Sequence, residues 1–430
     1  MENKHGTEHT KALLVGLNCG DLADFDNSDE DTMEELERLL NTAGGECVLS
    51  ALQNRKTPDP GTFIGSGKAS ELAAAVKANE INLAVFDNEI TPSQNRALEE
   101  LLGCRVIDRS ALILDIFAGR ANTREGKLQV ELAQYKYLLP RLTGMWGHLV
   151  RQTASSSPIG TRGPGETQLE TDRRHIRRKI QKLESEIEEV RRIRSVQRSK
   201  RVKSRIPLIC LVGYTNAGKS TLLNTLTGAG VHAADRLFDT LDPTTRLMQT
   251  EDMGELLISD TVGFIRKPPH HLIDAFRATL EELCYADVLV HVVDGSDPNY
   301  RLRAEVVEKL ITELGADRTP VVTVYNKADL LTEEELPRSR DSVCISAKTG
   351  NGVDLLLDAI RRALGKNERE INIVLPYSES RLLDMLYRDA TVISAEYRDD
   401  GIAVTARCDG EVCGRLKDYL PKKAPEIWEV

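Results

Sequence analysis

The stretch GYTNAGKST, from Gly213 to Thr221, organises the interpretation of this chain. A continuous apolar run over residues 206–212 predicts a buried strand before it, and Leu222, Leu223 and Leu226 predict one face of a helix after it. A strand, a glycine-rich turn and a helix in this order are the setting of a phosphate-binding loop. A chance match in a glycine-containing turn is the alternative, and the flanking pattern disfavours it.

The residues of this loop have distinct expected roles. A β-carbon at Gly213 or Gly218 would obstruct the backbone, so glycine lets several N–H groups converge on phosphate oxygens at the helix N-terminus. Lys219 would reach the β- and γ-phosphates and act in catalysis, and the Ser220 hydroxyl would ligate Mg²⁺. The other predicted nucleotide contacts of the loop are Tyr214, Thr215, Asn216, Ala217 and Thr221.

Length and composition set outer bounds. The chain has 430 residues, of which 40% are hydrophobic and 29% charged, and about 150 residues per domain predicts about three domains. No apolar run approaches the roughly 18 residues of a membrane span, and the polar start is unlike a signal peptide, so we expect a cytoplasmic protein without a membrane anchor. The eight scattered cysteines favour reduced thiols over disulfides or a zinc site.

Residues 1–124 are predicted to form an α/β domain, because strand and helix patterns alternate as in an open parallel sheet. Strands are expected over residues 11–16, 47–52, 83–87 and 105–107, with helices over 32–43, 68–78 and 92–102. The acidic cluster from Asp21 to Glu37 is expected to be a solvated loop and helix start. The turn GSGK, Gly65–Lys68, is interpreted as a tight turn, with an anion site at the helix N-terminus as the alternative.

Residues 125–205 predict an antiparallel helical hairpin, because two narrow apolar seams with spacings of four and three flank one loop. The first seam is Leu128, Leu132, Tyr135, Leu139 and Leu142, and the second is Ile176, Ile180, Leu183, Ile187, Val190, Ile193 and Val196. Pro140 is expected to kink or end the first helix. Residues 144–165, rich in Gly, Ser, Thr and Pro, are expected to form a mobile loop at the tip.

The second hairpin helix carries an excess of positive charge. Residues 173–205 hold 14 Lys or Arg and 4 Glu, although the whole chain has a formal net charge of −10. Such an asymmetry predicts a localised contact with a phosphate backbone, with the loop GTRGPG (Gly160–Gly165) and its Arg162 entering a narrow site. A merely solvated charged face is the alternative.

The segment FDTLDPTTR, Phe238–Arg246, has the features of a nucleotide switch. Thr240 is the favoured second Mg²⁺ ligand and a predicted catalytic residue, while Thr244 and Thr245 are close competitors that spacing alone does not separate. The other predicted nucleotide contacts in this segment are Phe238, Asp239, Leu241 and Asp242.

A second predicted switch follows a strand over residues 255–259 and reads DTVG. Asp260 can hold Mg²⁺ through water, and Gly263 is a predicted catalytic residue whose amide can meet the γ-phosphate. Thr261 and Val262 are further predicted nucleotide contacts. Loss of the γ-phosphate would release both segments.

The motif NKAD, after a predicted strand over 320–325, selects the base. The Asp329 carboxylate can accept from two N–H donors of guanine that adenine does not offer, which predicts GTP over ATP. Further predicted base contacts come from this motif and from SAK, which follows a strand over 342–345: Asn326, Lys327 along the base plane, Ser346, Ala347 whose amide supports guanine O6, and Lys348. With a further strand over 288–294, these signals predict a GTPase domain over residues 206–366.

This set of motifs resembles the HflX family of ribosome-associated GTPases over nearly the whole chain. The most specific part is GPGETQLETDRR (Gly163–Arg174), beside GYTNAGKS, FDTLD, DTVGF, NKAD and SAK. The resemblance implies GTP hydrolysis and binding of the large ribosomal subunit and its rRNA, with the hairpin directed to the peptidyl-transferase region. It also implies splitting or rescue of stalled or idle ribosomes under stress, by a protein expected to be monomeric.

Two residues bear on the rate of hydrolysis. Many GTPases place a glutamine after DTVG to orient the attacking water, but this chain has Phe264, which predicts slow unaided hydrolysis that the ribosome stimulates. Asn216 resembles the asparagine that ligates K⁺ in some related GTPases, which suggests a second metal cofactor.

Residues 367–430 are predicted to form a small α+β domain that is either an interaction module or a stabilising appendage. Strands are expected over 371–375, 391–396 and 402–406, with helices over 378–387 and 415–420. A different class of function remains as an alternative, namely an RNA-binding or RNA-unwinding protein with a separate N-terminal ATP site and GTP as regulator. A membrane-linked signalling GTPase is disfavoured, because no lipidation motif is visible.

Overall fold

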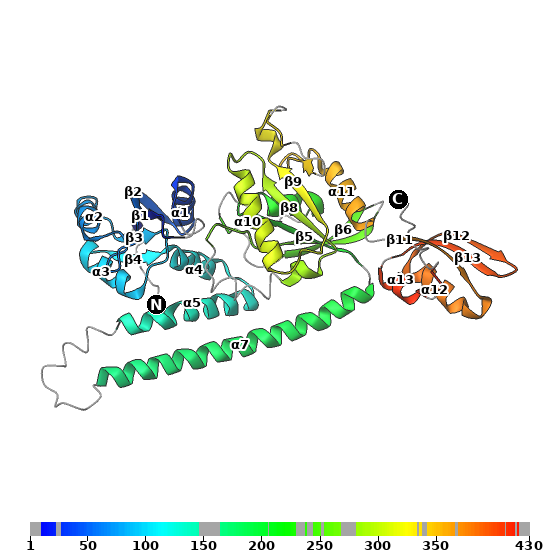
Figure 1. The fold of residues 1–430 in the computed structure, drawn as a ribbon, viewed down its shortest axis with the longest axis horizontal. Helices are drawn as coiled ribbons and strands as arrows, with labels where there is room; N and C mark the ends of the chain where they lie inside the picture. Colours follow the sequence, from blue (N-terminus) through cyan, green and yellow to red (C-terminus); the bar gives the residue numbers. More distant parts are fainter. Residues whose placement is uncertain are drawn as a thin grey trace, which may run out of the picture.

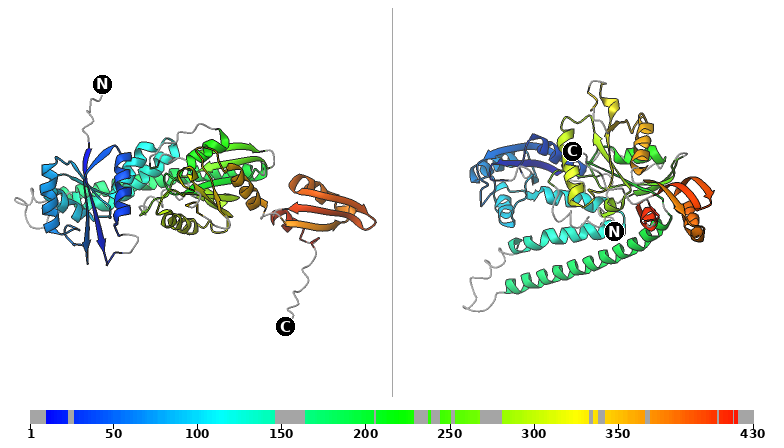
Figure 2. Two further views of the ribbon diagram at one scale, coloured as in Figure 1. Left: turned by 90° about the horizontal axis from the view of Figure 1, so that it is seen from above. Right: turned by 45° about the vertical axis from the view of Figure 1, so that its right-hand side comes forward.

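The computed structural model contains three sheets that follow one another along the long axis, with two long helices along one side (Figure 1). Figure 2 shows the same linear order from two further directions. The predicted α/β fold class, with a helical hairpin and a small C-terminal α+β unit, is confirmed. The structure describes residues 10–22, 27–145, 164–204, 206–228, 237–238, 244–250, 253–267, 281–332, 335–337, 342–365, 369–408, 410–417 and 419–420.

The N-terminal sheet has four parallel strands in the order β2-β1-β3-β4. Buried side chains alternate along β1, so that Leu14 packs with α1 and α4 on one face, and Leu13 packs with α2 and α3 on the other. The elements are β1 (Thr10–Cys19), α1 (Glu30–Thr42), β2 (Gly45–Arg55), α2 (Ser66–Ala78), β3 (Leu83–Phe86), α3 (Pro92–Leu102), β4 (Arg105–Asp108) and α4 (Arg109–Arg120).

The acidic stretch at the start of α1 is not a solvated loop, and that expectation was wrong for three of its carboxylates. Asp29 caps α1 and also pairs with Arg266 at 3.1 Å, while Asp31 pairs with the same guanidinium at 3.0 Å. Glu35 is buried and pairs with Arg109 at 3.0 Å. Arg266 of the neighbouring domain compensates the first two charges and Arg109 of the same domain compensates the third, which is the condition under which carboxylates can leave water.

The arm consists of α5 (Arg124–Met145) and α7 (Pro164–Ser204), which pack against each other along the predicted seams (Figure 1). Leu128 and Leu132 lie buried against Ile180, Leu183 and Ile187. At about 1.5 Å per residue, the 41 residues of α7 span about 60 Å, so α7 runs past α5 to the second sheet. Residues 146–163, which include Arg162, lie outside the described residues.

Two details of the arm differ from the sequence-based expectation. Pro140 does not end α5, which continues to Met145. On either side of Pro140, Tyr137 and Arg141 bind the buried carboxylate of Asp108 at 2.8 and 2.7 Å, and these tertiary contacts hold this part of the helix in place. The buried part of the second seam ends before Ile193, whose side chain is 51% exposed, although the next residue, Arg194, still pairs with Glu125 in the first turn of α5.

The second sheet has six strands in the order β10-β9-β8-β5-β7-β6, all parallel except β6. Strand β6 was not expected, and it begins at Thr244 inside the predicted switch segment. The elements are β5 (Leu208–Gly213), α8 (Lys219–Thr227), β6 (Thr244–Thr250), β7 (Gly254–Asp260), η1 (Glu281–Tyr285), β8 (Val288–Asp294), α10 (Tyr300–Glu313), β9 (Val321–Asn326), η2 (Ala328–Leu330), β10 (Ser342–Cys344) and α11 (Val353–Gly365).

The third sheet is antiparallel, in the order β11-β13-β12, and the predicted β-α-β-β-α sequence of elements is correct. The terminal helix lies earlier than residues 415–420, because Val412, Cys413 and Leu416 are buried against the sheet and set its position despite two glycines. The elements are β11 (Arg369–Leu375), η3 (Tyr377–Glu379), α12 (Ser380–Asp389), β12 (Thr391–Arg398), β13 (Gly401–Cys408) and α13 (Gly410–Arg415).

All eight cysteines are free thiols, as their scattered positions predicted. Among the described residues, no helix combines the length and apolar character that a membrane span requires. The same residues contain no cluster of His, Cys, Asp and Glu with the arrangement of a metal centre.

The stability of the second sheet should depend on pH through His291 of β8. This side chain is 1% exposed, neither ring nitrogen has a hydrogen-bond partner among the described residues, and burial with the charge of Lys219 lowers its pKa to about 4. The unfolded chain binds a proton below pH 6.5 while the folded chain stays neutral, so stability falls from pH 6.5 towards pH 4.

Replacing the imidazole in His291→Leu should remove this part of the acid sensitivity, which amounts to at most about 3 kcal/mol. Urea unfolding between pH 7 and pH 4 measures it. A variant that loses as much stability as the wild type over this range would contradict the assignment.

Candidate nucleotide-binding site

Four of the predicted motifs meet at one edge of the second sheet. The phosphate loop follows β5, DTVG follows β7, NKAD begins at the end of β9 and SAK follows β10. These strands are parallel, so their carboxyl ends lie at the same edge, where ligands bind in open α/β sheets.

The glycines of the phosphate loop allow close approach to the neighbouring strands. A β-carbon on Gly213 would lie 2.2 Å from the carbonyl oxygen of Val292, and one on Gly218 would lie 2.2 Å from the amide nitrogen of Asn326. Gly218 also has φ of +92°, a conformation that costs other residues energy. The loop therefore packs directly on the ends of β8 and β9, and its glycines serve this approach.

Lys219 and Ser220 open α8 and face the adjacent motifs. The buried Lys219 ammonium donates to the carbonyls of Gly213 and Tyr214 at 3.1 and 2.9 Å, and burial lowers its pKa to about 8 against the opposing effect of the Asp260 charge. The Ser220 hydroxyl donates to the Asp260 carboxylate at 2.6 Å. Two hard oxygen groups held together beside a phosphate loop form a donor set that fits Mg²⁺.

Gly263 of DTVG lies against the phosphate loop. A β-carbon there would lie 2.8 Å from the Thr215 methyl group and 3.1 Å from the Lys219 ammonium. The next residue, Phe264, is buried, and its backbone exchanges hydrogen bonds with Gly213 and Thr215 at 3.2 and 2.8 Å. Gly263 thus lies close to the Lys219 ammonium, which would meet the γ-phosphate. The Phe264 side chain has no polar group that could orient a water molecule.

The first predicted switch is described only at its two ends. Phe238 is buried against Phe117 of α4, with 4.6 Å between ring centroids, and Asp239, Thr240, Leu241 and Asp242 lie outside the described residues. The Thr245 hydroxyl donates to Ser259 at 3.1 Å, while Thr244 lies opposite Asp260 in the β6–β7 ladder. The Thr245 side chain is therefore hydrogen-bonded within the sheet. The assignment of Thr240 as a Mg²⁺ ligand stays a prediction.

Asn326 connects the three loops expected to surround the base. Its side chain donates to the carbonyl of Ala217 at 2.9 Å and accepts from the amide of Ala347 at 2.9 Å. Lys327 pairs with Asp294 at 2.7 Å, Asp329 is exposed at the rim, and Ser346 is buried beside Ala347. The Ala347 amide predicted to face guanine already has a partner within the protein.

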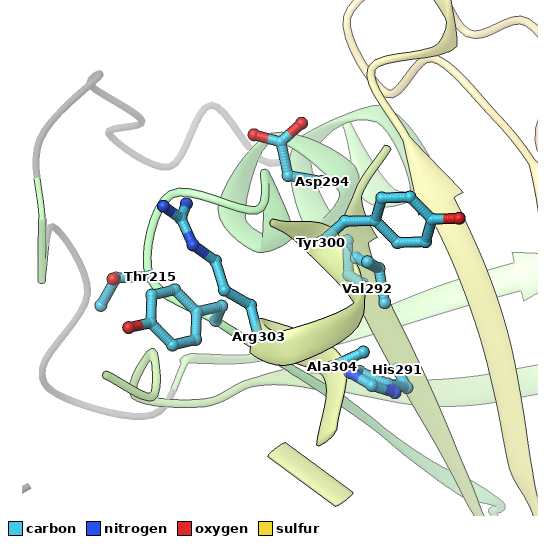
Figure 3. A pocket seen from close by; sticks show the side chains of 9 residues that line it. Thr215, His291, Val292, Asp294, Tyr300, Arg303 and Ala304 are labelled. Carbon is cyan, nitrogen blue, oxygen red and sulfur yellow. The ribbon is translucent and has the colours of Figure 1, made fainter. Parts of the chain in front are cut away.

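A small pocket separates the phosphate loop from α10, and Figure 3 shows Arg303 extending from α10 toward the side where Thr215 lies. The Arg303 guanidinium lies 5.3 Å from the centroid of the Tyr214 ring and pairs with Asp31 of the N-terminal domain at 3.1 Å. The pocket is lined by Tyr214, Thr215, His291, Val292, Val293, Asp294, Tyr300, Arg303 and Ala304. The phosphate loop thus borders residues of both domains.

Sequence reasoning missed a group of buried and partly buried polar residues between the first and second sheets, here called the intersheet cluster. Asp87 and Arg109 directly follow β3 and β4. Polar residues at the carboxyl ends of parallel strands often form binding sites, so the positions of these two residues could have indicated a site. Their partners in the second sheet offered none, because Arg266 and Lys267 resemble ordinary surface cations. The cluster consists of Glu35, Asp87, Arg109, Tyr214, Arg266 and Lys267.

Comparison with known proteins gives four family models that match the chain in order. They describe a GTP-binding GTPase N-terminal region (residues 30–118), a GTP-binding GTPase middle region (120–201), a 50S ribosome-binding GTPase (208–327) and an HflX C-terminal domain (332–417).

Relatives match over most of their length. The GTPase HflX of Caldanaerobacter subterraneus subsp. tengcongensis is 46% identical over 392 residues, 91% of this chain and 91% of the relative. The GTPase HflX of Escherichia coli (strain K12) is 45% identical over 381 residues, 87% and 89% of the two chains. A crystal structure of SsGBP in complex with GDP has 26% identity and a TM-score of 0.45, covering 83% of this chain and 99% of that chain.

The second sheet and the motifs at its edge, together with the family models and the two GTPase HflX relatives, define a P-loop GTPase. Both relatives share more than 40% of their residues with this chain along nearly its full length. The chain belongs to the HflX family of GTPases.

The lowered pKa of Lys219 should make nucleotide binding depend on pH. With its pKa at about 8 in the protein alone, Lys219 loses its proton above this pH, and phosphates contacting the ammonium would raise the pKa again. Binding then takes up a proton, and the dissociation constant for GTP should rise by up to about tenfold per pH unit above pH 8. Titration calorimetry in buffers of different ionisation enthalpy measures this uptake, and binding without it at pH 8.5 would contradict the prediction.

Proposed function

We propose that the strand-end loops of the second sheet bind GTP with Mg²⁺ and that the chain hydrolyses it on the large ribosomal subunit. The observation that carries the nucleotide assignment is the convergence of Lys219, Ser220, Asp260 and Gly263 at the start of α8. Lys219 would hold the β- and γ-phosphates and Gly263 would donate to the γ-phosphate, while Asp329 would select guanine. Bound Mg²⁺ would neutralise phosphate charge between Ser220 and Asp260.

The chain's own residues would stabilise charge rather than perform proton transfer. In phosphoryl transfer the protein acts mainly by positioning and by electrostatics, and the Lys219 ammonium beside the Gly263 amide provides both. Phe264 supplies no hydrogen bond to an attacking water, so hydrolysis should be slow until the ribosome orders the site.

Ribosome association would use the arm. Some of its arginines form ion pairs within the protein, and others do not. Towards the C-terminal end of α7, Arg191 and Arg192 pair with glutamates one turn away, and Arg194 pairs with Glu125 of α5 at 2.8 Å. Arg177 and Arg178, nearer the N-terminal end of α7, are exposed, and none of the described residues forms an ion pair with them. Among the side chains of α7 that the structure describes, residues 170–194, the charge without an ion-pair partner therefore lies in the N-terminal half of the helix, toward the tip of the arm, where rRNA phosphates would meet it.

We infer a cycle in which GTP favours the ribosome-bound form and hydrolysis permits release, so that a monomer splits or rescues stalled or idle ribosomes under stress. The support is the match to a 50S ribosome-binding GTPase model together with the exposed basic tip of the arm.

The alternative of a separate ATP site at GSGK has less support. The guanidinium of Arg55 donates to the Ile64 carbonyl at 2.7 Å and lies where a β-carbon on Gly65 would be, so a side chain already covers this turn. Lys68 pairs with Glu71 along the helix at 2.6 Å. This geometry favours a structural tight turn.

Co-sedimentation with purified large ribosomal subunits tests the proposal. The protein should pellet with the subunits in the presence of a non-hydrolysable GTP analogue and remain largely in the supernatant with GDP. Reversing two tip charges in Arg177→Glu with Arg178→Glu should weaken binding at least tenfold and reduce its dependence on salt by about two counter-ions, while GTP affinity stays unchanged.

A matched control is the reversal of two exposed arginines on α11, Arg361→Glu with Arg362→Glu, which makes the same change in net charge away from the arm. Equal weakening by both pairs would mean that net charge, and not the arm tip, governs association.

A potassium ion at Asn216 is a further part of the proposal. Asn216 adopts φ of +63° in the phosphate loop, beside the loop's phosphate-facing amides. A K⁺ ion there would add positive charge next to the transferred phosphate, so GTP turnover should be several-fold faster in KCl than in NaCl at equal ionic strength, and Asn216→Ala should abolish the difference. Equal rates of the wild type in the two salts would remove K⁺ from the site.

A further inference from the structure

The intersheet cluster joins the N-terminal domain to the nucleotide loops through buried charges. Asp87 is 0% and Arg109 2% exposed, and they pair at 2.8 Å. Lys267, in the segment after β7, donates to the other oxygen of Asp87 at 2.5 Å, and the same oxygen accepts from the Ser28 hydroxyl at 2.6 Å. Burial raises the pKa of Asp87, but Arg109 and Lys267 lower it by more, so this carboxylate stays charged.

One branch of the cluster reaches the phosphate loop. The hydroxyl of Tyr214, between Gly213 and Thr215, donates to the Glu35 carboxylate at 2.8 Å and accepts from the Arg266 amide at 2.7 Å. Arg109 pairs with the same Glu35 at 3.0 Å. Burial and the Glu35 charge raise the pKa of Tyr214, so its hydroxyl remains a donor. Residues of the N-terminal domain thus hold the second residue of the loop.

The other branch holds the segment that follows Gly263. The Arg266 guanidinium pairs with both Asp29 and Asp31, and the backbone carbonyl of Arg266 accepts a hydrogen bond from Arg109 at 3.2 Å. Lys267 is anchored on Asp87. Only three residues separate Gly263 from Lys267, so these anchors restrict where the Gly263 amide can lie.

We propose that Asp87 and Glu35 are positioning residues for GTP, because they hold the Gly263 segment and the phosphate loop in the arrangement that receives the γ-phosphate. Neither side chain belongs to the second sheet, so the nucleotide site is completed by the N-terminal domain. The inference rests on the proposed placement of the γ-phosphate between Lys219 and Gly263.

The proposal distinguishes GTP from GDP. GDP has no γ-phosphate, so its binding does not depend on the Gly263 amide. If the cluster no longer holds the Gly263 segment in place, GTP must order this segment on binding, and its affinity falls. Loosening the anchors should therefore weaken GTP binding selectively. By reciprocity, bound GTP should tighten the contact between the two domains by the same factor.

The test is a double-mutant cycle on Asp87→Asn and Lys267→Gln in the full chain, with dissociation constants for a non-hydrolysable GTP analogue and for GDP. Each single variant should weaken binding of the analogue by about tenfold and change GDP binding less than about twofold. The effects of the two should not add in the double variant, because the pair acts as a unit. Hydrogen exchange in α1 and β3 should slow when the analogue binds the wild type and not when it binds the double variant.

Two further variants keep the result interpretable. Asp31→Asn with Arg266→Gln removes a partly exposed pair of the same interface, and it serves if the buried substitutions prevent folding. Asp358→Asn, in an exposed pair with Arg361 on α11, is the matched control and should change neither affinity.

Equal losses for the analogue and GDP would show that the cluster is merely structural, and tighter binding of the analogue would show that it restrains the segment away from GTP. Either outcome overturns the inference. Gly263→Ala tests the placement of the γ-phosphate separately: if this variant binds the analogue as well as the wild type does, the proposed function fails at this point whatever the cluster does.

Discussion

The guanidinium of Arg109 is a positive charge that the protein has removed from water, and the arrangement of its two largest domains follows from this. An unpaired buried charge costs several kcal/mol, on the order of 3–5 when one partner of a pair is removed. Arg109 avoids this cost by pairing with Asp87 and Glu35, and it also donates to the carbonyl of Arg266 in the segment after β7. Asp87 and Glu35 together carry one negative charge more than Arg109 balances, and Lys267, in the segment after β7, supplies the second cation. The cluster is therefore balanced in charge only when the N-terminal domain lies against the nucleotide loops.

The N-terminal sheet accordingly uses its carboxyl edge in an unusual way. In open parallel sheets this edge takes a small ligand, and in the second sheet it carries the phosphate loop and the base motif. In the first sheet, Asp87 and Arg109 stand at the same edge and receive Lys267 and the Arg266 backbone. Two sheets of similar architecture thus face each other, one presenting a nucleotide site and the other binding the segment that forms it.

The sequence allowed good prediction wherever the determining contacts are local. The phosphate loop, the parallel strands of the first and second sheets and most of the arm seam follow from apolar spacing and glycine position over one or two turns, whereas the antiparallel strand β6 was not predicted. The intersheet cluster could not be predicted, because its partners lie far apart, with Asp87 and Lys267 separated by 180 positions, and a buried acid has the same sequence pattern as a solvated one. Pro140 and α13 were misjudged for a similar reason, since tertiary contacts there outweigh local propensity.

The arm is joined to the N-terminal sheet at the end of β4, next to Arg109. Asp108, the residue before Arg109, is completely buried, and its carboxylate caps α4 and accepts from Tyr137 and Arg141 of α5. One strand end therefore holds both the C-terminal half of α5 and the cluster that contacts Tyr214 and the Gly263 segment. Because the arm and the N-terminal sheet share these buried bonds, a force on the arm acts on the sheet as a whole. If GTP tightens the contact between the sheets, an rRNA contact that requires the arm in that orientation must favour GTP by the same free energy, since coupling between two binding events is reciprocal.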